Sequence, residues 1–232
     1  MYYFALLQTP ERELSADELT AEMQAYADFH ARAADALRAG DALAPAAEAV
    51  RIAGGPDRPT ITDGPFVEGA EVAGGFYVFE ADDLDEALEL ARQVPAARYG
   101  AVEVWPMVHW QAPDAPTTGN DWLALLLEPA GQLTAPGTPE WEEGAQRHVE
   151  LGATAGEYVL GGAPLHLPQT ATTVRVRGSE VLLTDGPFAE SAEVANGFYL
   201  LRAADRDEAV KVATMIPAST VLLRRLAGVA GL

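Results

Sequence analysis

An internal duplication constrains this chain more than any other feature of its sequence. The segment ITDGPFVEGAEVAGGFYVFEADDLDEA begins at Ile61, and LTDGPFAESAEVANGFYLLRAADRDEA begins at Leu183. The two segments align without a gap and share 18 of 27 residues. Because the repeat returns after the length of a whole domain, it predicts two copies of one domain rather than a solenoid. We expect a first unit over residues 1–108, a linker containing Pro and Thr over 109–121, and a second unit over 122–232.

Both halves carry the same order of local signals. Apolar runs at 2–7 and 122–128 are typical of buried strands. Helices should follow Ser15, which can form a capping box with Glu18, and Thr138, which precedes a proline. Further strands, a second helix and a final strand complete each half, which is the order of a ferredoxin-like α+β unit. Such a unit leaves one sheet face bare and apolar, so we expect the two units to cover each other as a pseudo-dimer.

The composition excludes several functions. The chain has no cysteine, which rules out disulfides, thiolate chemistry and zinc–thiolate sites. Its net charge of −20 would repel a phosphate backbone or an anionic membrane, so neither nucleic acid nor membrane is an expected partner. No apolar run approaches a membrane helix, and the first residues lack the basic start of a signal peptide. We predict a cytoplasmic protein, either a monomeric pseudo-dimer or a higher homo-oligomer, with a small molecule as its ligand.

A histidine and an aspartate in each half are candidates for acid–base chemistry. Asp63 and Asp185 end strands inside the repeated TDGPF, and His30 and His148 lie on the predicted inward stripes of the first helix of each unit. For His30 that stripe comprises Leu19, Met23, Tyr26 and Leu37. A carboxylate beside an imidazole would raise its pKa and create a general acid or base near neutral pH. The alternatives are an aspartate that braces its own Gly-Pro turn and a histidine that only packs.

Other residues are weaker candidates. Phe66 and Phe188 could belong to the core or line a small apolar pocket, and Arg98 and Tyr99 could contact an anionic substrate group. The glutamates after each turn, in EGAEV and ESAEV, are expected to be solvated loop residues. No metal-ligand spacing, phosphate loop, nucleophile elbow or dinucleotide fingerprint is present, so neither a metal nor a cofactor is expected.

The segments TDGPFVEGAEVAGGFY and TDGPFAESAEVANGFY, with their flanks, resemble the YCII-related (DGPF-type) domain family. The resemblance covers most of both halves and implies a dimeric α+β barrel formed by the two ferredoxin-like units. It also implies a His–Asp pair in a cleft, and in some relatives a link to aromatic breakdown chemistry. Ala70 and Ala192 replace a lysine that is common in the family, and ARYG at 97–100 has become STVL at 219–222.

Two functions follow as expectations. One is a cofactor-independent enzyme for small molecules, with His30 and Asp63, and also His148 and Asp185, transferring protons. The other is a non-catalytic accessory that binds a ligand or a partner. The resemblance connects this second function to sigma-factor-dependent transcription, because DGPF-type proteins often accompany sigma factors of the extracytoplasmic-function type.

Overall fold

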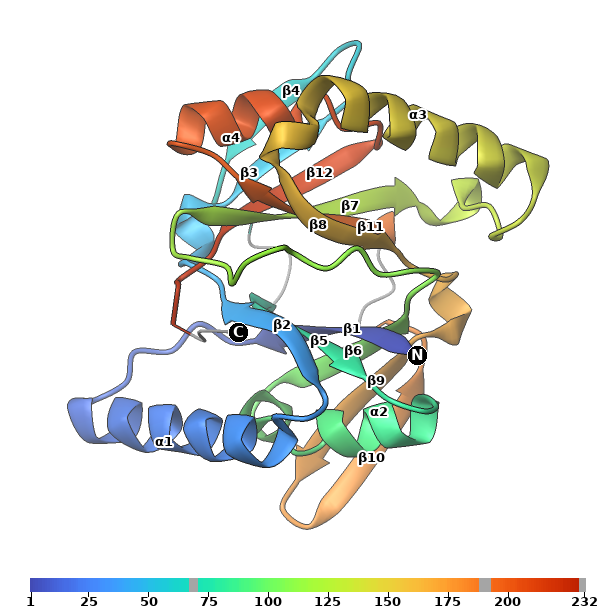
Figure 1. The fold of residues 1–232 in the computed structure, drawn as a ribbon. Coiled ribbons are helices and arrows are strands. Elements are labelled where there is room, and N and C mark those ends of the chain that lie inside the picture. The colour runs from blue at the N-terminus through green and yellow to red at the C-terminus, as the bar shows by residue number, and fades with distance from the viewer. Residues whose placement is uncertain (67–70, 188–192, 230–232) are drawn as a thin grey trace.

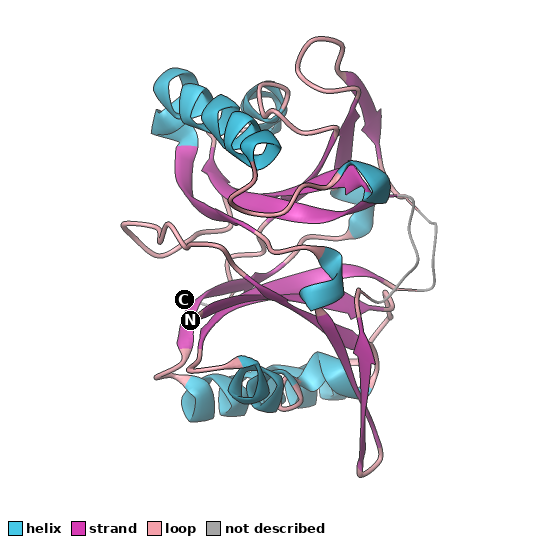
Figure 2. Cartoon of the chain, turned by 90° about the vertical axis from the view of Figure 1, so that its right-hand side faces the viewer, coloured by secondary structure: helices cyan, strands magenta, loops and turns pink. Residues whose placement is uncertain are grey.

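The computed structural model describes residues 1–66, 71–187 and 193–229. Within these ranges the strands form two six-stranded sheets, with four α-helices on their outer sides (Figure 1). The view in Figure 2 shows the two sheets facing each other between the outer helices. The protein is therefore α+β, with two ferredoxin-like units packed as an intramolecular dimeric α+β barrel, as predicted.

The two units have the same strand order. The first unit supplies six elements: β1 (Tyr2–Thr9), α1 (Ala16–Ala33), β2 (Leu37–Ala42), β5 (Val72–Glu80), α2 (Leu84–Ala91) and β6 (Ala101–Pro106). The second supplies their counterparts: β7 (Asp121–Pro129), α3 (Pro139–Ala155), β8 (Val159–Pro164), β11 (Glu193–Arg202), α4 (Arg206–Ala213) and β12 (Thr220–Arg225). The antiparallel orders β6-β1-β5-β2 and β12-β7-β11-β8 are both that of a ferredoxin-like sheet.

The long helices begin where the sequence predicts. Ser15 and Glu18 form the complete capping box of α1, and the Thr138 side chain accepts a hydrogen bond from the Trp141 backbone at the start of α3. These contacts satisfy backbone N–H groups that have no partner within a helix. Among the described residues, no helix combines the length and the apolar character needed to span a bilayer.

Each unit donates a β-hairpin to the sheet of the other unit. The hairpin of β3 (Val50–Ala53) and β4 (Thr60–Asp63) extends the second unit's sheet beside β12. The hairpin of β9 (Thr172–Arg177) and β10 (Glu180–Asp185) extends the first unit's sheet beside β6. It projects at the bottom of Figure 1, near α2. The strands that lead into the repeated TDGPF segments, β4 and β10, are thus edge strands of the opposite unit's sheet.

The facing sheets close at two seams into a barrel. At one seam the chain after β2 meets the chain after β12, where the Ala44 N–H donates to the Arg225 carbonyl at 2.9 Å. At the other, the chain after β6 meets the end of β8, where the Val108 N–H donates to the Pro164 carbonyl at 3.0 Å. These bonds satisfy backbone groups that would otherwise be unpaired near the ends of the sheets.

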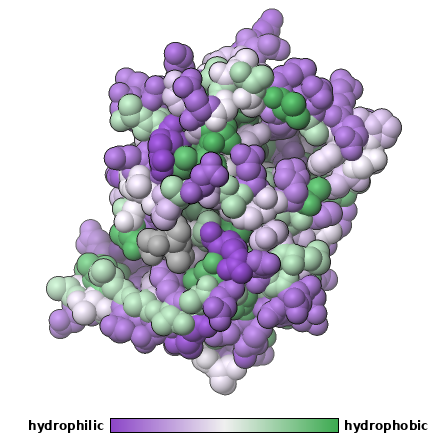
Figure 3. Space-filling view, in the orientation of Figure 1, coloured by the Kyte–Doolittle hydropathy of each residue, from purple (hydrophilic) through white to green (hydrophobic). Residues whose placement is uncertain are grey.

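The barrel interior is an apolar core to which both units contribute. Phe4 of β1 stacks on Phe198 of β11 with ring centroids 4.3 Å apart, and Trp105 is fully buried in the same cluster. Two further clusters fill the space between each sheet and its own helices. On the outside, hydrophilic residues cover most of the face shown in Figure 3, and apolar side chains form small separate groups there.

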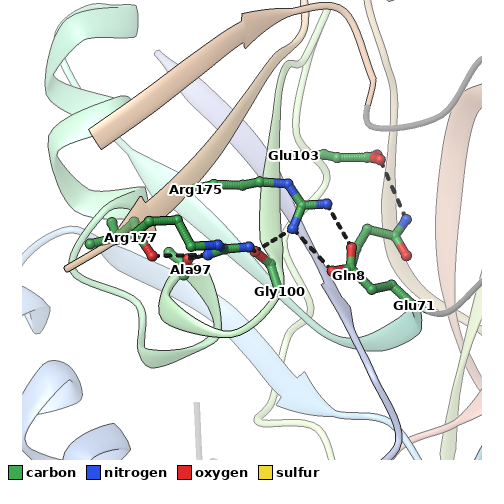
Figure 4. Close-up of polar contacts among 8 residues, drawn as sticks. Gln8, Glu71, Ala97, Gly100, Glu103, Arg175 and Arg177 are labelled. Atoms are coloured by element: carbon green, nitrogen blue, oxygen red, sulfur yellow. Dashed lines mark hydrogen bonds and ion pairs between the residues drawn. The ribbon is translucent and has the colours of Figure 1, made fainter. Parts of the chain in front are cut away.

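A pair of equivalent ion pairs fastens the exchanged hairpins. Arg175 of β9 binds Glu71 in a bidentate contact, with distances of 2.7 and 3.0 Å, and also donates to the Gly100 carbonyl (Figure 4). In the other sheet Arg51 of β3 binds Glu193 at 2.5 Å. Glu71 and Glu193 occupy the same place in the repeat, so each pair joins a carboxylate of one unit to an arginine of the other. The expectation that these glutamates are solvated was therefore wrong; Glu68 and Glu190 lie outside the described residues.

The predicted inward stripe of α1 also needs correction. Leu19 and Met23 are 50% and 62% exposed, whereas Phe29 and Ala33 are the buried residues of the helix. Leu37 lies in β2 rather than in the helix. The C-terminal half of α1 packs on the sheet and its N-terminal half extends beyond it, which helical periodicity does not reveal.

We expect Arg175→Gln to destabilise the protein by about 2–3 kcal/mol, because it leaves the largely buried Glu71 carboxylate without its cationic partner. Urea unfolding monitored by tryptophan fluorescence would measure the change. Arg38→Gln removes the same charge from an exposed pair with Glu80 and should cost under about 1 kcal/mol. Equal losses in the two variants would contradict a special role for the Arg175 pair.

Candidate functional site

Each histidine of the long helices is hydrogen-bonded to a tyrosine of its own unit. The His30 Nε2 atom lies 2.7 Å from the Tyr77 hydroxyl, and the His148 Nδ1 atom lies 2.9 Å from the Tyr199 hydroxyl. Tyr77 and Tyr199 are equivalent in the repeat, in FY of β5 and β11. Each unit therefore has a His–Tyr pair between its long helix and its sheet, although the two histidines stand one helix turn apart in the aligned helices. From the sequence alone, both tyrosines look like core aromatic residues, so their hydrogen-bonding role was missed.

The structure does not pair these histidines with the aspartates of TDGPF. The Asp63 carboxylate is 71% exposed and forms an ion pair with Arg206 at the start of α4. Because its hairpin joins the second unit's sheet, Asp63 lies on the opposite side of the barrel from α1 and His30. Asp185 is also exposed, and its side chain forms no hydrogen bond or ion pair with the described residues. A catalytic role for the two histidines and the two aspartates stays a prediction.

Burial, not a neighbouring charge, controls the electrostatics of the His–Tyr pairs. Desolvation lowers the pKa of His148 to about 4, with a smaller contribution from the Arg147 charge. Desolvation also lowers the pKa of His30. It raises the pKa of Tyr199 to about 12 and raises that of Tyr77 as well. The histidine pKa shifts are opposite to the one expected from an adjacent carboxylate, and both pairs are neutral at pH 7.

A cavity of about 1200 Å³ opens between α3 and its sheet at the second pair. His148 and Trp141 line it from the helix, and Tyr199 lines it from β11. The predicted linker contributes His109 and Gln111, and the Gln111 backbone pairs with Gly162. The cavity, called the α3 cavity below, therefore combines aromatic surface with a half-buried polar pair, as ligand sites commonly do.

The equivalent space beneath α1 is filled by side chains. The Tyr26 and Tyr99 hydroxyls lie 3.1 Å apart, and Tyr99 donates to Glu22 at 2.7 Å. The Arg12 guanidinium lies 3.9 Å above the Tyr99 ring. Burial raises the pKa of Tyr26 to about 12 and raises that of Tyr99 too, so both hydroxyls remain protonated donors.

Three differences between the repeats account for this contrast. The buried residues of the two helices, Phe29 and Ala33 in α1 and Leu151 and Ala155 in α3, correspond at the same offset of 122 as the strands that follow them. Leu151 therefore replaces Phe29, and His148 stands in the place of Tyr26. The strand registers place Thr220 where the first unit has Ala101, so the second unit is three residues shorter before this strand and has no aromatic residue in the place of Tyr99. A Cβ atom added at Gly144 would meet only the tip of Arg147, at 3.9 Å, so the space around this glycine is open. Loss of aromatic volume at these positions produces the α3 cavity.

Acidic groups outnumber cations around the α3 cavity. Its lining contains four carboxylates and one arginine: Asp57, Glu128, Glu140, Glu143 and Arg147. The Glu128 carboxylate is held by the Ser219 backbone N–H at 2.9 Å and by the Ser219 hydroxyl. The lining is therefore unfavourable for an anion. Among the described residues, no group of three His, Asp or Glu side chains is arranged to hold a metal ion.

The remaining predicted residues occupy different places. Tyr99 is part of the packing beneath α1, and the neighbouring Arg98 lines a separate surface crevice. Phe66 is half-buried and is not among the residues that line the α3 cavity. Phe188 lies outside the described residues. The structure does not bring Arg98, Tyr99 and Phe66 into one pocket, and a substrate-binding role for these residues stays a prediction.

The fold, with its two His–Tyr pairs, defines a tandem α+β-barrel protein. A family model for the YCII-related domain matches residues 1–111 and 135–221. The chain therefore belongs to the YCII-related family and carries two copies of its domain. Uncharacterized protein R00369 of Rhizobium meliloti (strain 1021) is 36% identical over 95 residues, which cover 39% of this chain and 75% of the relative. A solved structure, "Putative Chlorite dismutase TA0507", aligns over 97% of this chain and 94% of its own at 8% identity, with a TM-score of 0.40.

The low pKa of His148 predicts a loss of stability in acid. In the unfolded chain His148 has a pKa near 6.5, whereas in the folded protein its pKa is about 4. Between these pH values the unfolded state binds a proton that the folded state does not, and this favours unfolding. The free energy of unfolding is therefore unaffected by this histidine above pH 6.5 and decreases as the pH falls toward 4, by at most about 3 kcal/mol. In His148→Gln, urea unfolding between pH 7 and 4 should show a shallower fall in the free energy of unfolding. An equally steep fall would contradict the assignment.

Proposed function

We propose that this protein binds a small organic molecule in the α3 cavity, with His148 and Tyr199 as its hydrogen-bonding centre. The observation that carries the proposal is the contrast between the repeats. Both have a His–Tyr pair, but Tyr26 and Tyr99, which fill the space beneath α1, have no tyrosine counterpart beneath α3. An accessible, desolvated polar pair in an aromatic cavity is a typical ligand-binding arrangement.

The lining supports an uncharged or cationic ligand. Four carboxylates face one arginine around the cavity, so an anion would be repelled unless it reached only Arg147. Trp141 and Tyr199 offer aromatic surface to the body of the ligand, and an aromatic face also attracts a cation. An aromatic or cyclic molecule with one polar group satisfies both features.

The protonation states favour recognition over proton abstraction by histidine. With a pKa of about 4, His148 is a weak base at pH 7, and Tyr199 keeps its proton. When the tyrosine donates to the imidazole Nδ1 atom, the Nε2 atom carries the remaining proton and can donate to a ligand. A neutral imidazole that donates a hydrogen bond can also polarise a carbonyl group of a bound ligand. If the protein is an enzyme, this is the catalytic role that the site supports.

Filling the cavity should abolish binding without weakening the fold. Gly144→Leu places a side chain in the open space and replaces a helix-interior glycine with a better helix former. We expect phenethylamine and 2-phenylethanol to shift the Trp141 indole and His148 ring resonances in NMR titrations of the wild type, while 3-phenylpropionate does not. Affinity for the first two probes should fall at least about tenfold in Gly144→Leu, the effect of about 1.4 kcal/mol.

Gln146→Leu is the matched control, because Gln146 is exposed on α3 and is not among the cavity-lining residues. It should bind both probes as the wild type does. Equal binding by Gly144→Leu would refute the α3 cavity as the site, and a preference for 3-phenylpropionate would refute the predicted ligand charge.

A further inference from the structure

Three arginines converge on a crevice outside the first unit. Arg32 in the last turn of α1, Arg92 at the C-terminal end of α2 and Arg98 at the end of the 3₁₀ helix η2 (Pro95–Arg98) line a space of about 610 Å³. The turn of the β9–β10 hairpin, at Gly178 and Ser179, forms another wall. This arginine crevice lies on the other side of the barrel from the α3 cavity.

Helix termini alone do not explain this cluster. A cation near a helix C-terminus interacts favourably with the helix dipole, yet the second unit has no arginine at the matching positions. Thr154 and Thr214 stand in the places of Arg32 and Arg92, and over the described residues 214–219, between α4 and β12, the second unit has no 3₁₀ helix to correspond to η2. The chain carries 35 acidic and only 15 basic residues, so the gathering of three arginines in one crevice runs against its overall composition.

The arginines are available to a ligand. Arg32 and Arg98 are exposed and form no ion pair with the described residues. Arg92 binds Glu89 at 2.5 Å within one helix turn, but this pair is solvent-exposed and correspondingly weak.

A fourth arginine holds the crevice in shape. Arg177 of β9 donates to the Ala97 carbonyl at 2.9 Å and to the Gly100 carbonyl at 3.1 Å (Figure 4). These bonds fix the hairpin beside η2, so the wall of the crevice exists before any ligand arrives. The Arg177 guanidinium also adds a positive charge near Arg98.

We propose that the arginine crevice binds a small multivalent oxyanion, either a phosphate ester or a polycarboxylate. Guanidinium groups match the geometry of both anions through paired N–H donors. A ligand with several anionic groups is favoured, because the three arginines lie on separate elements and such a ligand can contact more than one of them at once. The crevice therefore favours an anion, whereas the α3 cavity favours an uncharged or cationic ligand.

Calorimetric titration with inorganic pyrophosphate and with citrate, at low ionic strength, tests the proposal. We expect saturable one-site binding, with an affinity that falls at least about fivefold in Arg98→Gln and in Arg32→Gln, because each variant removes a charge-assisted hydrogen-bond donor. Stronger binding of pyrophosphate would assign a phosphate ligand, and stronger binding of citrate a carboxylate ligand.

The matched control is Arg58→Gln. Arg58 is exposed near the tip of the other exchanged hairpin and does not line the crevice, but the variant changes the net charge equally. It should keep the wild-type affinity for both anions. No saturable binding, or an equal loss in Arg58→Gln and Arg98→Gln, would overturn the proposal. Neither result would affect the α3 cavity, whose probes and variants are different.

Discussion

The apolar contact between the two sheets is the interaction on which the rest of the structure depends. A ferredoxin-like sheet with both helices on one face leaves the opposite, apolar face bare. Removing this apolar face from water is the main driving force for the association of the two units. Phe4 and Phe198 stack across this contact. Once the faces meet, the chain ends of β2 and β6 reach those of β12 and β8, and the seams can form. The exchanged hairpins can then join the opposite sheets, where Arg175 and Arg51 fasten them.

This architecture places the two copies of any site on opposite sides of the molecule. His30 and Tyr77 lie between α1 and one sheet, while His148 and Tyr199 lie between α3 and the other. With two sheets and an apolar core between them, a change in one copy need not disturb its twin. The duplicated chain can therefore keep one copy densely packed, through Tyr26 and Tyr99, while the other opens a cavity. A homodimer, whose two copies share one sequence, cannot separate these roles.

The fold was predictable from the sequence, and the site was only partly so. The repeat, the helix caps and the apolar strands are local signals, and together they predicted the element order and the facing sheets. The exchange of hairpins is not local: nothing in TDGPF says which sheet its strand will join. That one fact decides that Asp63 meets Arg206 rather than His30, and that Glu71 is buried against Arg175. The sequence predicted the inward histidines but not their tyrosine partners. A tyrosine in an apolar strand looks like a core residue, because the sequence does not show where its hydroxyl group will lie.

The distribution of charge differs between the outer surfaces of the two units, and so do the ligands that each surface favours. Most of the described ion pairs use an arginine to neutralise a carboxylate, either across the exchanged strands, as with Arg51, or at the surface, as with Arg225 and Glu48. Few cations remain in so acidic a chain, and where they are placed therefore determines where an anion can approach. The first unit gathers Arg32, Arg92 and Arg98 outside its filled helix layer. The second surrounds its open cavity with carboxylates. Duplication followed by this division of charge gives one barrel two surfaces with opposite preferences, which a symmetric pair of identical units could not provide.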